Sequence, residues 1–222
     1  MGAVLTVSSE RALHPDVSVA LAQVNAAGES VSGDVPVAVR CRDGLLVAAI
    51  DGLGHGAPAR EAATRAAAVL ADGCDEPLPA LIERCHAALA GTRGAALTVA
   101  RIDARDHSLT WLGIGNVNGV LVPAVDGAAA PEALLLAGVV GDQLPQLVPV
   151  TLPLVAGDTV LLATDGVDDA IADGLRVRGA LGPLADGLLQ RHRRGPSDDA
   201  LVLLARFEPG SGAAGSTAAI LS

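Results

Sequence analysis

Four aspartates share one local setting, which is the end of an apolar run beside glycine or another turn-forming residue. The four motifs are Ser32-Gly33-Asp34, Asp51-Gly52-Leu53-Gly54, Thr164-Asp165-Gly166 and Pro196-Ser197-Asp198-Asp199. A lone Asp-Gly step is also a common turn, so no single motif identifies a site. Each motif adjoins an apolar run that reads as a buried strand, and such strand ends can bring their carboxylates together at one edge of a sheet.

A cluster of carboxylates favours a particular chemistry. Because the motifs lack cysteine and hold few histidines, the ligand set suits a hard, oxygen-loving cation, and we expect Mg²⁺ or Mn²⁺ in place of Zn²⁺. Carboxylates this close repel one another unless metal charge compensates them. Two such ions can share a water molecule, lower its pKa and hold the oxygens of a phosphoryl group during in-line attack. The motifs therefore indicate hydrolysis of a phosphate ester.

Length, composition and charge limit the class of protein. The chain has 222 residues, of which 50% are hydrophobic, and this is enough for one sizeable core. We expect a single domain over residues 1–208 and a flexible tail of small residues over 209–222. The net charge of -10 argues against nucleic acid and against a membrane surface as partners, because both attract basic proteins. A protein partner is more compatible with this charge.

The cysteines and the lack of long apolar segments bear on the compartment. Cys41, Cys74 and Cys85 are odd in number and lack C-x-x-C spacing, so their pattern indicates neither a disulfide framework nor a zinc knuckle. The sequence contains no basic region followed by a long apolar stretch at its beginning, and no run of about 18 apolar residues later. We therefore expect a cytoplasmic protein in a reducing compartment.

Short apolar runs and amphipathic segments predict the elements that position the aspartates. Strands are expected at 3–7, 35–41, 45–50, 95–102, 108–114, 117–122, 147–152, 159–163 and 200–207, and helices at 58–71, 77–90 and 179–193. Turn signals of a few residues between several strands favour antiparallel pairing. Because each helix has one apolar face that must cover a sheet, we expect an α+β fold, a four-layer αββα sandwich. Residues 125–131 are predicted to form a surface loop.

The motifs also carry a family resemblance. Gly33-Asp34, Asp51-Gly52-Leu53-Gly54-His55-Gly56, Gly113-Ile114-Gly115-Asn116-Val117, the run from Gly157 to Gly166, and Ser197-Asp198-Asp199-Ala200 occur in the order found in metal-dependent PPM (type 2C-like) serine/threonine phosphatases. The chain most resembles the bacterial branch of this family that contains SpoIIE and RsbX. The resemblance spans roughly residues 32–207. Each motif is short, but the ordered set is specific.

The resemblance implies a PPM phosphatase fold with a site for two Mn²⁺ or Mg²⁺ ions at one end of the sandwich. Carried over by motif, Asp51 would bridge both ions and the Gly52 carbonyl would bind one of them. Asp165 and Asp198 would hold the other ion, and Asp34 would contact the ions directly or through another ligand. Asp51, Asp165 and Asp198 are therefore the expected catalytic residues.

Some residues of the motifs stay open at this level. Asp199 adjoins Asp198, and because neighbouring residues on a strand face opposite sides, we favour Asp198 as the ligand. His55 does not stand directly after the Asp-Gly step, as the histidine of many eukaryotic relatives does, so it is either a general acid or an exposed or packing residue. Asn116 is predicted to shape a tight turn. The basic run 191–194 is typical of a solvated helix end, with docking of an acidic partner as the alternative.

The resemblance also implies a substrate. A phosphatase of this branch would remove phosphate from phosphoserine or phosphothreonine on a bacterial regulatory protein, with metal-activated water as the nucleophile. The partner implied is a STAS-domain protein of a stress or sigma-factor switch. Two alternatives remain, a non-catalytic PPM-like binding module and a phosphatase that acts on small molecules. The retained acidic set argues against the first, because a scaffold has no need for crowded carboxylates.

Overall fold

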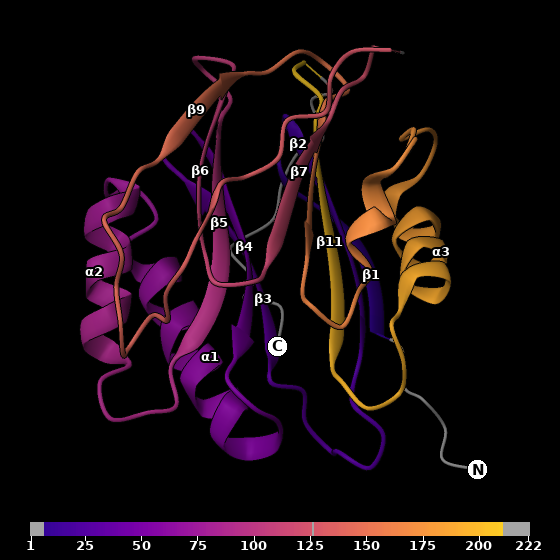
Figure 1. Cartoon of the computed structure of the whole chain (residues 1–222). Helices are drawn as coiled ribbons and strands as arrows, with labels where there is room; N and C mark the ends of the chain where they lie inside the picture. The colour runs from indigo at the N-terminus through magenta and orange to yellow at the C-terminus, as the bar shows by residue number, and fades with distance from the viewer. Residues whose placement is uncertain (1–6, 126, 211–222) are drawn as a thin grey trace.

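The computed structural model describes residues 7–125 and 127–210, which form two sheets packed face to face (Figure 1). The first sheet has the order β1-β2-β11-β10-β7, with β1 (Val7–His14), β2 (Val17–Val24), β7 (Asn118–Val122), β10 (Thr159–Ala163) and β11 (Ala200–Phe207). The second has the order β3-β4-β5-β6-β8, with β3 (Asp34–Cys41), β4 (Gly44–Gly52), β5 (Ala95–Asp103), β6 (Ser108–Ile114) and β8 (Leu135–Leu136). The strand β9 (Val150–Pro153) pairs with β6.

Helices cover the outer face of each sheet. Figure 1 shows α1 (Gly56–Asp72) and α2 (Leu78–Ala88) on the side of the second sheet, and α3 (Leu181–His192) on the side of the first. A short 3-10 turn, Asp169–Ala172, packs beside α3. The layer order is therefore helix, sheet, sheet, helix, and the predicted αββα sandwich is confirmed.

Strand β4 illustrates why a continuous apolar run forms a strand here. Leu45, Val47 and Ala49 face the other sheet, whereas Leu46 and Ile50 face the helices α1 and α2. Both faces of the strand are buried, so the sequence shows no polar alternation. The helix that follows is rich in alanine, a strong helix former whose small side chain lets α1 lie close on the sheet.

The N-terminal hairpin is the largest difference from the expected elements. The predicted strand 3–7 lies outside the described residues except for Val7. The structure instead pairs β1 with β2, and β2 with β11 at the centre of the first sheet, and neither β1 nor β2 is among the expected strands. The sequence of β1 includes Ser8, Ser9, Glu10 and Arg11, which an apolar pattern does not mark as a strand, because β1 is an edge strand. The predicted tail lies outside the described residues from position 211 on.

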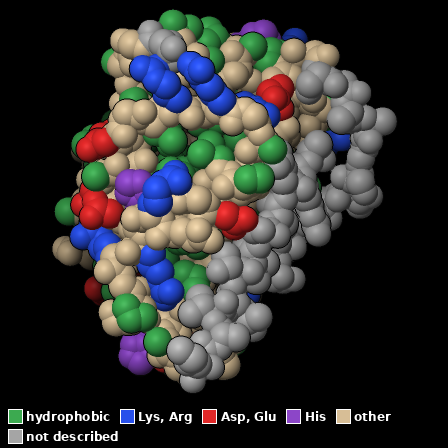
Figure 2. Space-filling model, turned by 90° about the vertical axis from the view of Figure 1, so that its right-hand side faces the viewer, with side chains coloured by type: hydrophobic (Ala, Val, Ile, Leu, Met, Phe, Trp, Pro, Cys, Tyr) green, Lys and Arg blue, Asp and Glu red, His purple; other side chains and the backbone are tan. Residues whose placement is uncertain are grey.

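The basic run at the end of α3 is partly used in contacts within the fold. Figure 2 shows the side of the molecule that α3 covers, where basic side chains are spread over the surface with acidic ones among them. Arg193 donates to the carbonyl oxygens of Asn25 and Asp198, and Arg194 pairs with Asp169 at 2.8 Å. These two arginines join the end of α3 to loops beside the aspartate motifs, so the run is more than a solvated helix end.

Within the described part of the chain, none of the helices has the length and apolar character needed to cross a membrane.

Candidate metal centre

The four aspartates come together from both sheets. Asp34 and Asp51 lie on β3 and β4 of the second sheet, where they are directly paired in the antiparallel register. Asp165 follows β10 and Asp198 precedes β11, and these two strands are neighbours in the first sheet. The strand ends that carry the motifs therefore meet at one end of the sandwich, as the sequence predicts.

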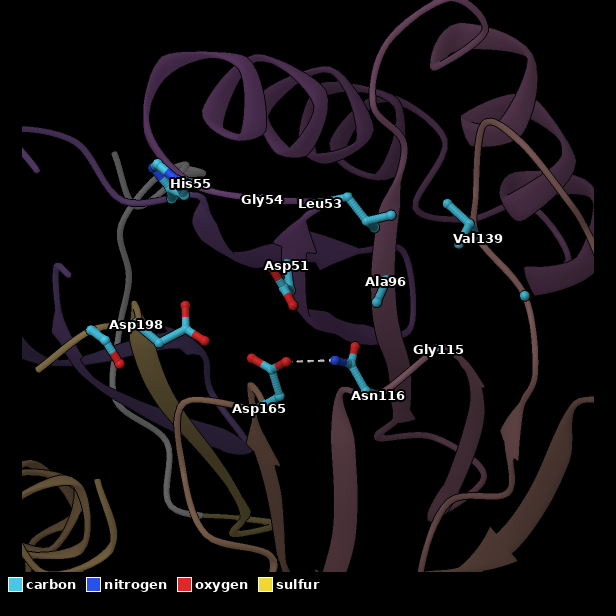
Figure 3. Close-up of a pocket in the computed structure, with 12 residues that line it drawn as sticks. Asp51, Leu53, Gly54, His55, Ala96, Gly115, Asn116, Val139, Asp165 and Asp198 are labelled. Atoms are coloured by element: carbon cyan, nitrogen blue, oxygen red, sulfur yellow. Dashed lines mark hydrogen bonds between the residues drawn. The ribbon is translucent and has the colours of Figure 1, made fainter. Parts of the chain in front are cut away.

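A cavity of about 520 Å³ opens between these strand ends. Asp51, Asp165 and Asp198 line it, and Figure 3 shows their carboxylates pointing toward one another across the same space. The other lining residues are Leu53, Gly54, His55, Ala96, Gly115, Asn116, Gly138, Val139 and Ser197. Asp34 and Gly52 are not among the lining residues; Asp34 pairs with Asp51 across the two strands, and Gly52 follows Asp51 in the chain. The three residues expected to be catalytic thus share one cavity.

Asp34 is held in place by a contact between the two sheets. Its side chain is buried, and the Thr164 hydroxyl donates to its Oδ2 at 2.7 Å. The same Thr164 oxygen accepts a hydrogen bond from the backbone N–H of Leu201 at 2.9 Å. Thr164 directly precedes Asp165, so one buried hydroxyl links the carboxylate of one sheet to the strand ends of the other.

Glycine at position 52 is required by the close approach of α1. A Cβ atom at Gly52 would lie 2.0 Å from the carbonyl oxygen of Ala59, where no side chain fits. The Gly52 N–H donates to the Gly33 carbonyl at 3.2 Å, which extends the pairing of the two motifs. Gly52 therefore brings the first turns of α1 against the strand end that carries Asp51.

The adjacent aspartates of the last motif have different environments. Asp199 is buried and accepts hydrogen bonds from the backbone N–H groups of Ala26 at 2.8 Å and Gly33 at 2.7 Å. Asp198 instead lines the cavity, and its Oδ1 accepts from the Asp199 N–H at 2.9 Å. Asp199 thus anchors the loop before β3, while Asp198 remains the residue of the pair with access to a cation.

The crowding of these carboxylates changes their acidity. Burial raises the pKa of Asp51 to about 7, with the charges of Asp165 and Asp198 as further causes. Burial also raises the pKa of Asp34 well above its usual range, with Asp51 as the next cause. For Asp165, burial and then the Asp198 charge raise the pKa, whereas Arg194 lowers it. Ionised carboxylates that are buried close together are unfavourable, and a bound divalent cation compensates their charge. The oxygen donors present here therefore fit Mg²⁺ or Mn²⁺.

Asn116 has a role that the sequence did not indicate. Its Nδ2 donates to Asp165 Oδ2 at 2.6 Å, and Figure 3 shows this bond at the edge of the cavity. Gly115 before it has a φ of 87°, a value that glycine adopts readily, and this turn delivers Asn116 to the cavity. The motif Gly113-Ile114-Gly115-Asn116 is visible in the sequence, but only the fold pairs its amide with Asp165.

His55 lies at the mouth of the cavity. Its side chain is 72% exposed, and its Nδ1 lies 2.7 Å from Glu29 Oε1. Arg93 lies beside the same loop, because its guanidinium occupies the space that a Cβ at Gly54 would need. His55 lines the cavity, whereas Arg93 is not among its lining residues.

Known proteins share this architecture. Phosphoserine phosphatase RsbX of Bacillus subtilis (strain 168) is 30% identical over 99 residues, which are 45% of this chain and 50% of RsbX, so the match spans half of that relative. A solved structure of RsbX in complex with magnesium superposes with a TM-score of 0.82 at 21% identity, covering 91% of this chain and 100% of that one. A structure from work on the bacterial stressosome gives 0.78 at 25% identity, with coverage of 86% and 99%. The catalytic domain of the phosphatase PstP in complex with 2 manganese ions gives 0.70 at 20% identity, with coverage of 87% and 99%.

The family model described as stage II sporulation protein E (SpoIIE) matches residues 42–208. This range contains β4 with Asp51, the Asn116 turn, and the strand ends with Asp165 and Asp198. The resemblance to the SpoIIE and RsbX branch of PPM phosphatases is confirmed. The chain belongs to the SpoIIE family.

Proposed function

We propose that this chain is a metal-dependent phosphatase that removes phosphate from phosphoserine or phosphothreonine on a bacterial regulatory protein. The observation that carries the proposal is the convergence of Asp51, Asp165 and Asp198 from two sheets into one cavity. The similarity to RsbX, a phosphoserine phosphatase, supports the same activity. The magnesium in the RsbX structure and the manganese in the PstP structure support the metal dependence.

The residues around the cavity would have distinct roles in binding metal and in positioning the ligands. Asp51, the Gly52 carbonyl, Asp165 and Asp198 would hold two Mg²⁺ or Mn²⁺ ions, with Asp34 next to Asp51. Ions bound there supply a water of lowered pKa and positive charge for the phosphoryl oxygens. Asn116 keeps the Asp165 carboxylate turned toward the cavity, and Thr164 keeps Asp34 beside Asp51. The open mouth near His55 gives access to a phosphorylated side chain that projects from a protein.

The partner we propose is a phosphorylated STAS-domain protein of a stress or sigma-factor switch. The stressosome structure among the neighbours and the match to RsbX favour this class of partner. We also propose that residues 1–208 act as one domain and that the protein works in the cytoplasm. The free cysteines of the described chain are compatible with a reducing compartment.

A direct assay tests the activity. The purified chain is incubated with p-nitrophenyl phosphate and with a serine-phosphorylated STAS-domain protein, with Mn²⁺ or Mg²⁺ and with a chelator. We expect metal-dependent release of phosphate from the phosphoprotein, lost in Asp51→Asn and kept in the matched control Asp106→Asn, an exposed turn residue between β5 and β6. If the chain hydrolyses neither substrate when metal is present, the enzyme assignment is contradicted. Hydrolysis of the small ester alone would favour a small-molecule phosphatase.

A further inference from the structure

A second group of metal-ligating side chains lies away from the aspartate cavity. The sulfurs of Cys41 and Cys74 and a carboxylate oxygen of Asp75 all lie within 4.8 Å of one another. Cys41 ends β3, whereas Cys74 and Asp75 lie in the loop that follows α1. The spacing of the cysteines in the sequence gives no sign of this group, because Cys41 and Cys74 lie 33 positions apart in the sequence.

This group lies at the opposite end of the sandwich from the aspartates. Strand β3 begins with Asp34 and ends with Cys41, and at about 3.3 Å per residue its two ends are roughly 23 Å apart. Helix α1 runs the same way, since it begins just after His55 and ends two residues before Cys74. The cysteine group is therefore a separate site and shares no ligand with the proposed catalytic centre.

Backbone contacts hold the three side chains in place. The Cys41 thiol lies 3.3 Å from the Cys74 carbonyl oxygen, and the Cys74 thiol lies 3.5 Å from the Arg40 carbonyl oxygen. Asp75 Oδ1 accepts from the Arg42 N–H at 2.8 Å, a bond that uses one of its two carboxylate oxygens. The end of β3 and the loop after α1 are thus joined by contacts from each segment to the backbone of the other. Both thiols are buried.

A small cavity adjoins the group and gives it access to solvent. Its volume is about 120 Å³, and its lining includes Cys41 and Asp75. The charged side chains around it are Arg42, Asp43, Arg101 and Asp103, two of each sign besides Asp75. This space can hold a water molecule as an additional ligand next to three protein donors.

We propose that Cys41, Cys74 and Asp75 form a second metal site, which takes a thiophilic divalent cation such as Zn²⁺. Four-coordinate zinc with bonds of about 2.3 Å to sulfur and 2.0–2.2 Å to oxygen places its ligand atoms roughly 3.5–3.8 Å apart. The atoms here, within 4.8 Å of one another, reach that geometry by shifts of about 1 Å or less. Two thiolates and one carboxylate favour this class of ion over Mg²⁺, which prefers oxygen ligands alone.

Binding at this site exchanges protons for metal. Each thiol loses its proton to solvent as its sulfur bonds to the cation, so one Zn²⁺ replaces two protons and no oxidant is needed. Without metal, burial raises the pKa of the Cys41 thiol, which the Arg101 charge opposes only in part. The Cys41 thiol therefore stays protonated until a metal binds, and the bound metal links the end of β3 to the loop between α1 and α2.

Cadmium titration of the full-length chain tests the proposal. Cd²⁺ bound to thiolate gives a charge-transfer absorption band that carboxylate ligands do not give, and excess Mg²⁺ is present to occupy the aspartate site. We expect a band that saturates at one Cd²⁺ per chain and that Zn²⁺ removes by competition. Cys41→Ser and Cys74→Ser should each weaken Cd²⁺ binding at least about 100-fold, since losing even an outer partner of a metal ligand costs 10–100-fold.

Matched variants distinguish this site from the aspartate centre and from the third cysteine. Cys85→Ser, which changes the buried cysteine in α2, should keep the band and the affinity. Asp165→Asn should also keep them, because it belongs to the aspartate centre. Asp75 is exposed, so Asp75→Asn is expected to fold, to keep the band and to bind Cd²⁺ about 10-fold more weakly.

Three outcomes would overturn the proposal. One is the absence of a thiolate band in the wild-type chain. Another is a band that survives in folded Cys41→Ser or Cys74→Ser. If either serine variant does not fold, unchanged Cd²⁺ affinity in Asp75→Asn would still exclude the three-ligand site. None of these results depends on phosphatase activity, so failure of the proposed function is recognised separately.

Discussion

Asp34 and Asp51 stand directly opposite each other in the antiparallel pair of β3 and β4. Two carboxylates in register on neighbouring strands destabilise a sheet unless another charge or hydrogen bond compensates them. Here Thr164 donates to Asp34, while Asp51 faces the cavity that it shares with Asp165 and Asp198. A cation bound beside Asp51 would therefore reduce the repulsion between the two carboxylates.

Neutralising Asp51 should therefore lower the activity without lowering the stability of the metal-free chain. In metal-free buffer at pH 8, Asp51→Asn removes one of several repelling charges, and we expect it to unfold at a denaturant concentration equal to or above that of the wild type. Its metal-dependent phosphatase activity should fall at least about 100-fold, as expected for loss of a direct ligand. Urea unfolding and the phosphoprotein assay measure the two effects, with Asp106→Asn as control. A metal-free Asp51→Asn chain that is clearly less stable would contradict the repulsion between these carboxylates.

The stability of the metal-free chain should depend on pH in a definite direction. The pKa of Asp51 is raised to about 7 in the folded chain, compared with about 3.9 for an unfolded aspartate. Between these values the folded chain binds more protons than the unfolded chain, so its free energy of unfolding falls as the pH rises. Asp34 and Asp165 shift the same way.

Urea unfolding in the presence of a chelator at pH 5 and pH 8 measures this effect. We expect a loss of about 2–4 kcal/mol at the higher pH, from about 1.4 kcal/mol per unit of pKa shift. Saturating Mn²⁺ should restore stability at pH 8, because the metal binds the deprotonated ligands. Greater stability at pH 8 than at pH 5 without metal would show that these carboxylates are not strained by burial.

Thr164→Val tests the contact between the two sheets. The substitution keeps the shape of the side chain but leaves Asp34 Oδ2 and the Leu201 N–H without their partner at a buried position. We expect a loss of about 1–3 kcal/mol in the free energy of unfolding, measured with metal present. Thr110→Val, which removes a hydroxyl bonded to Thr151 at a more exposed position, should change stability by less than about 0.5 kcal/mol. Equal effects of the two substitutions would mean that the Thr164 contact adds nothing specific.

Asn116→Ala tests the orientation of Asp165. Loss of the bond at 2.6 Å frees the carboxylate to turn from the cavity, and we expect kcat to fall about 10-fold with weaker Mn²⁺ activation. Asn118→Ala is the matched control, because the Asn118 amide bonds Asp169 outside the cavity. The metal concentration that gives half-maximal activity is the sensitive readout. Identical values in the two variants would exclude a positioning role for Asn116.

Gly52→Ala should disturb the junction between β4 and α1. The added methyl group would lie 2.0 Å from the Ala59 carbonyl oxygen, so α1 or the strand end must move. We expect a loss of more than about 2 kcal/mol in stability, together with lower activity, because the same strand end carries Asp51. Gly195→Ala, at a position where a methyl group meets open space, should leave both nearly unchanged. Thermal unfolding compares the two variants. A stable, active Gly52→Ala chain would show that α1 can shift to accommodate the methyl group with little loss of stability.

The sequence by itself determined most of the elements and predicted the chemistry of the site. Apolar runs such as 45–50 and amphipathic segments such as 58–71 carry their periodicity locally, so they predict β4 and α1 within a few residues. Aspartates beside glycine at strand ends predict oxygen donors at a sheet edge. Together with the order of the motifs, these local signals were enough for the layers and the family.

Only the tertiary structure decided which distant residues meet. Strand order and register place Asp34 opposite Asp51 and set Asn116 against Asp165, while Asp199 is turned to backbone N–H groups beside β3. The edge strand β1 lacks an apolar pattern, so it was found only through its pairing with β2. Cys41 and Cys74 likewise meet because β3 and α1 run the length of the sandwich and end together. Local patterns encode each element, but contacts between elements depend on packing that no single segment of the sequence contains.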